Sequence, residues 1–149
     1  MNILPFQKDD KEIFLRLCEE FYSSHATIRP FSGAVAEKTF ERVIAKHENL
    51  WGYLMFDKNT YEPVGYSLIT SYWCNEEGGN VLVLDELYIR PTERHKGYAT
   101  TFMEWLDENF KDKAVSITLE VLTTNIDAIK VYKKEGFSPD GFTTYTKQI

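Results

Sequence analysis

The chain has 149 residues, of which 43% are hydrophobic, and a formal net charge of −6 at pH 7. This length is typical of one domain that buries its own core, and the acidic balance argues against nucleic-acid binding through a broad basic face. No apolar stretch is long enough to span a membrane, and no secretory leader opens the chain, so the composition predicts a cytoplasmic protein without membrane or nucleic-acid partners.

The first third of the chain reads as a strand followed by two amphipathic helices. Residues 1–6 alternate loosely and predict a first strand. Residues 11–24 have apolar side chains at helical spacing behind a pair of aspartates, which favour a helix start. A break with proline, serine and glycine at 27–33 precedes a second predicted helix over 34–47.

The middle of the chain is rich in β-branched and aromatic residues. Three such runs, at 49–56, 63–73 and 80–89, are separated by short polar connections of the hairpin type. They predict three consecutive antiparallel strands.

The last third alternates between helix and strand patterns. Aromatic and leucine side chains at four-residue spacing predict a helix from 97 to about 113, and mixed Val, Ile, Thr and Leu predict a strand over 114–124. A short helix over 125–135 then ends at Gly136, a natural left-handed residue, and 141–149 predict a final strand.

Antiparallel strands therefore come first and a parallel strand–helix–strand unit follows. This order predicts a single α+β domain over residues 1–149, built on a mixed β-sheet and not on a doubly wound parallel one.

The stretch RHKGYA, Arg94 to Ala99, lies where a predicted strand gives way to a predicted helix. The first turn of a helix leaves backbone N–H groups without partners, and the helix dipole adds partial positive charge there. Gly97 allows a ligand close to the backbone, and Arg94 and Lys96 add full charges, which suits a pyrophosphate. The alternative is an ordinary turn with a solvated cationic cap. Neither a P-loop nor a G-x-G-x-x-G fingerprint is present.

Two motifs in sequence order resemble the GNAT superfamily of acyl-CoA-dependent N-acyltransferases. RHKGYA matches the family's R/Q-x-x-G-x-G/A loop, and NIDAIKVYKKEGF, from Asn125 to Phe137, matches N-x-x-A-x-x-x-Y-x-x-x-G-F without gaps. The likeness covers residues 80–137, whereas the first half agrees only in element order. Ala99 departs from the commoner last glycine of the loop.

The resemblance implies that the fourth and fifth strands splay apart and hold acetyl-CoA between them. Backbone groups of Leu87 and Ile89 would bond the pantetheine arm, with the Leu87 N–H also polarising the thioester carbonyl. The amides from His95 to Thr100 would cradle the pyrophosphate, and Asn125 would bond the arm from the other side. The implied co-substrate contacts are Leu87, Tyr88, Ile89, Arg94, His95, Lys96, Gly97, Tyr98, Ala99, Thr100, Asn125 and Ala128.

The same resemblance assigns two proton transfers. Tyr132 matches the tyrosine that protonates the departing thiolate, a task that a phenol with a pKa near 10 can perform; the alternative is a core tyrosine. Asp85 shares the strand parity of Leu87 and is the candidate base for the incoming ammonium, with Glu86 in reserve. One of these acids could instead pair structurally with a nearby arginine.

The reaction implied is acetyl transfer from acetyl-CoA to a primary amine by direct attack. The acceptor region, 21–31 and 71–79, is aromatic and mildly acidic, which fits a small amine or polyamine-like acceptor but also a peptide amine. A longer acyl donor, a non-catalytic CoA-binding domain and a homodimer remain open.

The metal and redox chemistry expected from the sequence is slight. Cys18 and Cys74 show no metal-type spacing and read as reduced thiols. His25, His47 and His95 are dispersed, so no metal site is predicted; His95 belongs to the loop and the other two read as surface residues.

Overall fold

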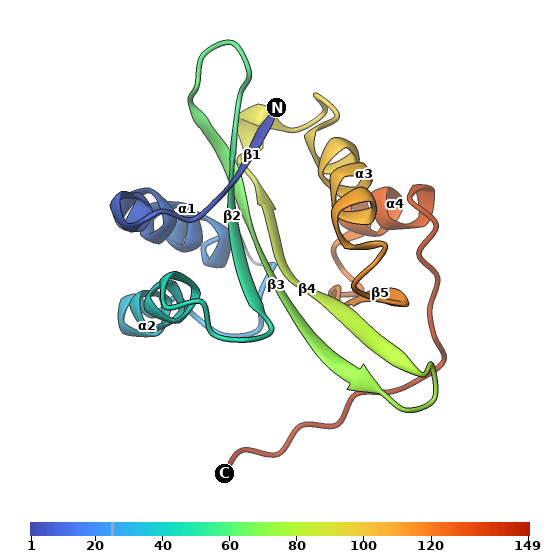
Figure 1. Ribbon diagram of the computed structural model, residues 1–149. Helices are drawn as coiled ribbons and strands as arrows, with labels where there is room; N and C mark the ends of the chain where they lie inside the picture. The colour runs from blue at the N-terminus through green and yellow to red at the C-terminus, as the bar shows by residue number, and fades with distance from the viewer. Residues whose placement is uncertain (25) are drawn as a thin grey trace.

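The computed structural model describes residues 1–24 and 26–149 and shows one sheet between two pairs of helices (Figure 1). Helices α1 and α2 cover one face of the sheet, and α3 and α4 lie on the other. The elements in chain order are β1 (Asn2–Pro5), α1 (Lys11–Tyr22), α2 (Gly33–Ile44), β2 (Leu50–Phe56), β3 (Pro63–Cys74), β4 (Gly79–Ile89), α3 (Tyr98–Phe110), β5 (Ser116–Leu119) and α4 (Ile126–Lys134). Short 3-10 turns, η1 (Lys8–Asp10) and η2 (Pro91–Glu93), precede α1 and α3.

The five strands follow the spatial order β1-β2-β3-β4-β5. Neighbours from β1 to β4 are antiparallel, whereas β4 and β5 are parallel and are joined through α3. The mixed sheet and the α+β class predicted from the sequence are therefore confirmed.

The sheet separates two hydrophobic cores. Toward α1 and α2, the rings of Phe14, Phe40 and Tyr66 are buried and pack with one another, with the Phe14 and Tyr66 centroids 5.3 Å apart. Toward α3, Phe102 and Leu106 are fully buried against the sheet. The four-residue spacing noted in the sequence is the buried stripe of α3.

The predicted final strand is wrong. Residues 141–149 form no strand, and Phe142 and Tyr145 are 81% and 92% exposed. The tail runs from α4 past the β3–β4 hairpin to the C-terminus (Figure 1), and the Thr144 hydroxyl donates a hydrogen bond to Glu120 at 3.3 Å. A strand forms only where a neighbour completes its ladder, so β-branched composition alone does not make one.

Element ends also differ from the expected ones. The strand predicted over 114–124 is regular only from Ser116 to Leu119, and the helix predicted from 97 begins at Tyr98 and ends at Phe110. The surface position expected for His25 lies outside the described residues.

Three further features of residues 1–24 and 26–149 concern membrane spans, metal ligands and cysteines. No helix among them is long and apolar enough to cross a membrane, and no three His, Cys, Asp or Glu side chains group there as metal ligands. Cys18 is buried and Cys74 half-buried, and both are free thiols.

Candidate active site

The sheet opens where β4 passes Asp85. Pairing of β4 with β5 runs from Val81–Ser116 to Leu84–Leu119 and then stops. At the same place the β3–β4 register shifts, because Leu84 faces Ile69 while Glu86 faces Leu68. Asp85 is thus the extra residue of a β-bulge, a feature that bends a strand.

Beyond the bulge, no strand of the described residues pairs with the edge of β4 that faces away from β3. The Arg90 N–H donates to the Val64 carbonyl at 2.9 Å, so in an antiparallel ladder the alternate residues Leu87 and Ile89 direct their backbone groups to the open edge. The Ile89 carbonyl accepts a hydrogen bond there from Arg94 Nε at 3.1 Å. Leu87 and Ile89 therefore present backbone N–H groups to the gap.

Tyr88 lies differently from its two neighbours. Its ring packs in the core against α1, and its hydroxyl donates to Glu20 at 3.2 Å. Glu20 is also held by Arg90, with an N···O distance of 2.7 Å. Neither Asp85 nor Glu86 forms a salt bridge with an arginine within the described residues.

The RHKGYA loop folds as a tight turn onto the start of α3. His95 and Gly97 both have positive φ, 63° and 82°, and α3 starts at the next residue, Tyr98. The Thr101 N–H donates to the Gly97 carbonyl at 3.0 Å and closes the first helical turn. The N–H groups of Tyr98, Ala99 and Thr100 precede that bond and have no intrahelical acceptor.

Side chains around the loop hold it in place. Lys96 pairs with Glu93 at 2.8 Å, and the Tyr98 hydroxyl donates to Asp57, whose carboxylate raises the pKa of Tyr98 to about 12. The Thr100 hydroxyl donates to Glu135 at 2.7 Å and so ties α3 to the end of α4.

The helix α4 contributes the second motif. Asn125 caps its N-terminus, where the side-chain oxygen accepts from the Ala128 N–H at 3.4 Å. The side-chain carbonyl is thereby used within the fold, and the NH₂ group of Asn125 is the part left for a ligand.

Tyr132 is half-buried beside Phe137, with ring centroids 5.9 Å apart. Its hydroxyl has no hydrogen-bond partner among residues 1–24 and 26–149. Burial raises the pKa of this phenol, which keeps it protonated at neutral pH.

The neighbouring acids of β4 have contrasting surroundings. Asp85 is exposed, but incomplete solvation at the bulge and, second, the charge of Glu120 raise its pKa. Glu86 is 9% exposed and accepts hydrogen bonds from the hydroxyls of Tyr22 and Tyr66, each at 2.6 Å. Burial raises the pKa of Glu86, while these two hydrogen bonds oppose the shift.

Strict alternation fails here because the bulge interrupts it. Leu84 and Leu87 lie three residues apart yet both pack on the α3 side, whereas Glu86 faces α1. The parity that linked Asp85 to Leu87 in the sequence therefore gives no information about where the Asp85 side chain lies.

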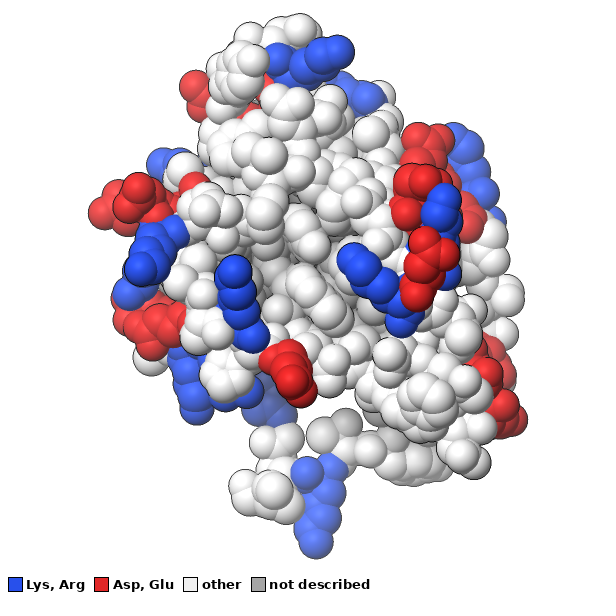
Figure 2. Space-filling view, viewed as in Figure 1, with Lys and Arg blue, Asp and Glu red and all other residues white. Residues whose placement is uncertain are grey.

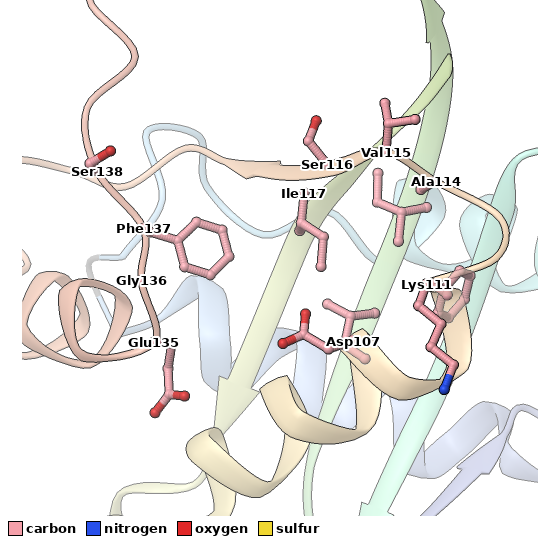
Figure 3. A pocket seen from close by; sticks show the side chains of 13 residues that line it. Asp107, Lys111, Ala114, Val115, Ser116, Ile117, Glu135, Gly136, Phe137 and Ser138 are labelled. Atoms are coloured by element: carbon pink, nitrogen blue, oxygen red, sulfur yellow. The ribbon is translucent and has the colours of Figure 1, made fainter. Parts of the chain in front are cut away.

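Two clefts flank the site. One, of about 590 Å³, lies between β5, the end of α3 and the end of α4, and contains none of the predicted site residues. Figure 3 shows the Phe137 ring and Ile117 pointing into it. The other, of about 360 Å³, lies between α1, α2 and β4 and has Glu86 in its lining. We call this second one the α1–α2 cleft.

Charged residues of both signs lie on the face of the molecule seen in Figure 2. Figure 2 shows Lys and Arg interspersed with Asp and Glu over the helices at both sides, with an uncharged strip between them. The charges on this face thus form small mixed clusters.

Comparison with known proteins identifies the family. The sequence model described as "Acetyltransferase (GNAT) family" matches residues 14–137. This chain belongs to the GNAT acetyltransferase family.

Individual relatives agree with this assignment. The chain is 28% identical over 104 residues to a D-amino-acid N-acetyltransferase of Saccharomyces cerevisiae, which covers 70% of this chain but 63% of that protein. The crystal structure of aminoglycoside N-acetyltransferase AAC(6')-Iy with CoA has a TM-score of 0.80 at 13% identity, covering 99% of this chain and 93% of that one. A ribosomal-protein-alanine N-acetyltransferase from Brucella melitensis biovar Abortus 2308 gives 0.77 at 15% identity, covering 99% and 98%. At these identities the two structures show the shared fold.

Sequence reasoning missed the partners of Glu86. Tyr22 and Tyr66 lie 64 and 20 residues away from it in the chain, and no local pattern joins them. The bulge did leave a trace, since two apolar residues flank the acidic pair in LDEL, a spacing that a regular strand would place on opposite faces.

Proposed function

We propose that this protein transfers the acetyl group of acetyl-CoA to a primary amine of a small molecule by direct attack, without an acyl-enzyme. The observation that carries the proposal is the opening of the sheet after Leu84 and Leu119, next to a helix N-terminus with a left-handed glycine. Membership of the GNAT family supports it, as does CoA in the structurally similar aminoglycoside enzyme.

The residues present fit this co-substrate. The open edge of β4 offers the N–H groups of Leu87 and Ile89 to an extended amide-bearing arm, as in strand addition. The first turn of α3, with Arg94 and Lys96 beside it, suits a pyrophosphate. The Asn125 NH₂ group would bond the arm from the side of α4. Acetyl-CoA, when bound, supplies a thioester carbonyl open to attack.

The chain's own groups then manage charge and protons. The Leu87 N–H would donate to the carbonyl oxygen as negative charge builds up on it. Asp85 would take a proton from the acceptor ammonium through water, and its raised pKa makes it a stronger base near neutral pH. Tyr132 would give its proton to the sulfur that leaves as the carbon–sulfur bond breaks.

The α1–α2 cleft is the proposed acceptor site. Its volume of about 360 Å³ fits one small molecule, and it approaches β4 at Glu86, one residue from both Asp85 and Leu87. Of the relatives whose names state an acceptor, the D-amino-acid and aminoglycoside enzymes support a small amine, whereas the ribosomal-protein-alanine enzyme acts on a protein. The chain is 28% identical to the D-amino-acid enzyme and 15% identical to the ribosomal-protein enzyme, and we therefore favour a small amine.

Thermal unfolding tests the co-substrate. Acetyl-CoA at a hundredfold excess over its Kd should stabilise the protein by about 2.7 kcal/mol, which raises Tm by roughly 5 to 10 °C, whereas NADH and ATP should leave Tm unchanged. A free-thiol assay with amines then separates an enzyme from a CoA-binding domain. An unchanged Tm with acetyl-CoA would overturn the proposal.

A further inference from the structure

The α1–α2 cleft has apolar and aromatic walls. Phe14 of α1, Phe31 of the α1–α2 connection and Leu68 of β3 line it. Such walls favour an acceptor with a hydrophobic body and leave its orientation to a few polar groups.

A buried carboxylate lines the cleft. Glu86 is 9% exposed, and its two oxygens accept hydrogen bonds from Tyr22 and Tyr66 at 2.6 Å. It forms no salt bridge with a lysine or arginine in the part of the chain that the structure describes. A buried carboxylate without a counter-charge attracts a cation strongly, so an ammonium entering this cleft is directed inward.

An exposed guanidinium lines the same cleft. Arg29 lines it from the α1–α2 connection and is exposed. No Asp or Glu oxygen within the described ranges lies within 4.0 Å of its side chain. Arg90, in contrast, is held by Glu20 with two hydrogen bonds of 2.9 and 2.7 Å. Among residues 1–24 and 26–149, no acceptor for the Arg29 guanidinium is found, so its planar set of donors is open to a ligand.

We propose that the α1–α2 cleft selects a zwitterionic acceptor, an amino acid whose ammonium faces Glu86 and whose carboxylate is bound by Arg29. This inference rests on the proposed acetyl transfer and names the acceptor class for it. A buried carboxylate and an exposed guanidinium line one cleft with apolar walls, and a molecule with both charges complements that pair. Guanidinium groups bind carboxylates through paired hydrogen bonds.

Other amines fit this cleft less well. A polyamine would bring its second ammonium toward Arg29, and like charges repel. A simple alkylamine would satisfy Glu86 but leave Arg29 without a partner. A peptide N-terminus has an ammonium followed by a neutral amide, so it too leaves the guanidinium unused.

Matched acceptors test the proposal. The D- and L-forms of leucine and phenylalanine should be acetylated with a kcat/KM about 10- to 100-fold above that of their amides and of isopentylamine and phenethylamine, because a hydrogen-bonded charge pair contributes that factor. Spermidine should be the poorest substrate. CoA release with a thiol reagent measures all of these rates.

Two variants locate the selectivity. Arg29→Met should raise KM for the amino acids about 10- to 100-fold and leave the amides unchanged, which removes the preference. Arg42→Met, an exposed arginine of α2 outside the cleft lining, should keep the preference intact.

The possible outcomes distinguish a failure of the amino-acid proposal from a failure of the proposed acetyl transfer. Absence of acetyl-CoA binding overturns acetyl transfer itself. Acetylation of the amides or amines as fast as the amino acids, or equal effects of Arg29→Met on both, leaves acetyl transfer standing and overturns the zwitterion. Acetyl-CoA binding without transfer to any amino acid overturns it as well.

Discussion

The two sides of β4 differ in how their polar groups are satisfied. Toward α1, Glu86 and Tyr88 are bonded to tyrosine and glutamate side chains, with distances of 2.6 to 3.2 Å. At the open edge, Leu87 and Ile89 face a gap with their backbone N–H groups. The first side stabilises the fold by itself, whereas the second is complete only when another molecule supplies acceptors. Polar groups of one strand thus have partners within the fold on the α1 side and, among the described residues, have no strand partner at the open edge.

The largest expected effect is on the open side. Gly97→Glu should weaken CoA binding by at least about 100-fold, because a carboxylate beside a pyrophosphate costs several kcal/mol. A Cβ at Gly97 meets nothing within 4 Å, so the fold should tolerate the change apart from strain on the order of 1 kcal/mol at positive φ. Calorimetric titration measures the affinity.

Gly97→Asn is the matched control for this substitution. Asparagine adopts left-handed backbone more readily than other residues, so this variant should retain most of the CoA affinity. Equal affinities of the glutamate variant and the native protein would show that the loop is only a turn.

The next effect is catalytic. Tyr132→Phe should lower kcat about 10²-fold, the lower end for general-acid catalysis, with KM for acetyl-CoA nearly unchanged. The loss of kcat should become smaller as pH rises, because a thiol with a pKa near 8.5 can then leave as the thiolate without being protonated. Tyr145→Phe, at a residue that is 92% exposed, serves as control. Full activity of Tyr132→Phe at neutral pH would show that Tyr132 is only a packing residue of the core.

On the α1 side of β4, the expected effect is on the stability of the fold. Tyr66→Phe removes one of the two hydroxyl donors to Glu86 and should cost about 1.5 to 3 kcal/mol in the free energy of unfolding, as for hydrogen bonds to charged groups. Tyr98→Phe removes a hydrogen bond to the half-buried Asp57. Because this bond is less buried than the bond to Glu86, its loss should cost less. Urea unfolding measures the loss in the free energy of unfolding for both variants. Equal losses would contradict the larger contribution expected for the bond to Glu86.

The smallest effect is a pH dependence. Because the pKa of Glu86 in the folded protein lies above its ordinary 4.5, the folded state binds more protons than the unfolded one between these two values. Stability contributed by this group is therefore full below about pH 4.5 and declines as pH rises through the raised pKa.

Urea unfolding of the native protein and of Glu86→Gln between about pH 4.5 and pH 8 measures this decline. The native protein should lose stability relative to the variant as pH increases. A difference independent of pH would mean that the folded pKa is not raised.

Much of this site could be anticipated because its signals are local in sequence. A glycine between a strand and a helix places free N–H groups whatever the distant partners are, and Gly97 is left-handed at the start of α3. The relative positions of Asn125 and Tyr132 are fixed by the helix α4, which begins after Asn125 and contains Tyr132. The α+β class followed from hydrophobic periodicity, which also needs no long-range knowledge.

What could not be anticipated depends on distant neighbours. The pairing of Glu86 with Tyr22 and Tyr66 comes from three separate elements. The tail failed as a strand prediction because its composition favours a ladder but the fold provides no neighbour for it. Strict alternation could not place the Asp85 side chain, because it assumes that a strand has no extra residue.

The bulge has a consequence for how many residues β4 can lose. Because Asp85 has no partner on β3, a chain shortened by this residue would still pair Leu84 with Ile69 and Glu86 with Leu68. Deleting any paired residue would instead turn the remainder of the strand over and expose its core side chains. Deleting residue 85 would therefore leave the packing of the core on both faces of the sheet unchanged. This deletion would straighten β4 against β5 and narrow the opening, so the length of one strand controls access to the sheet.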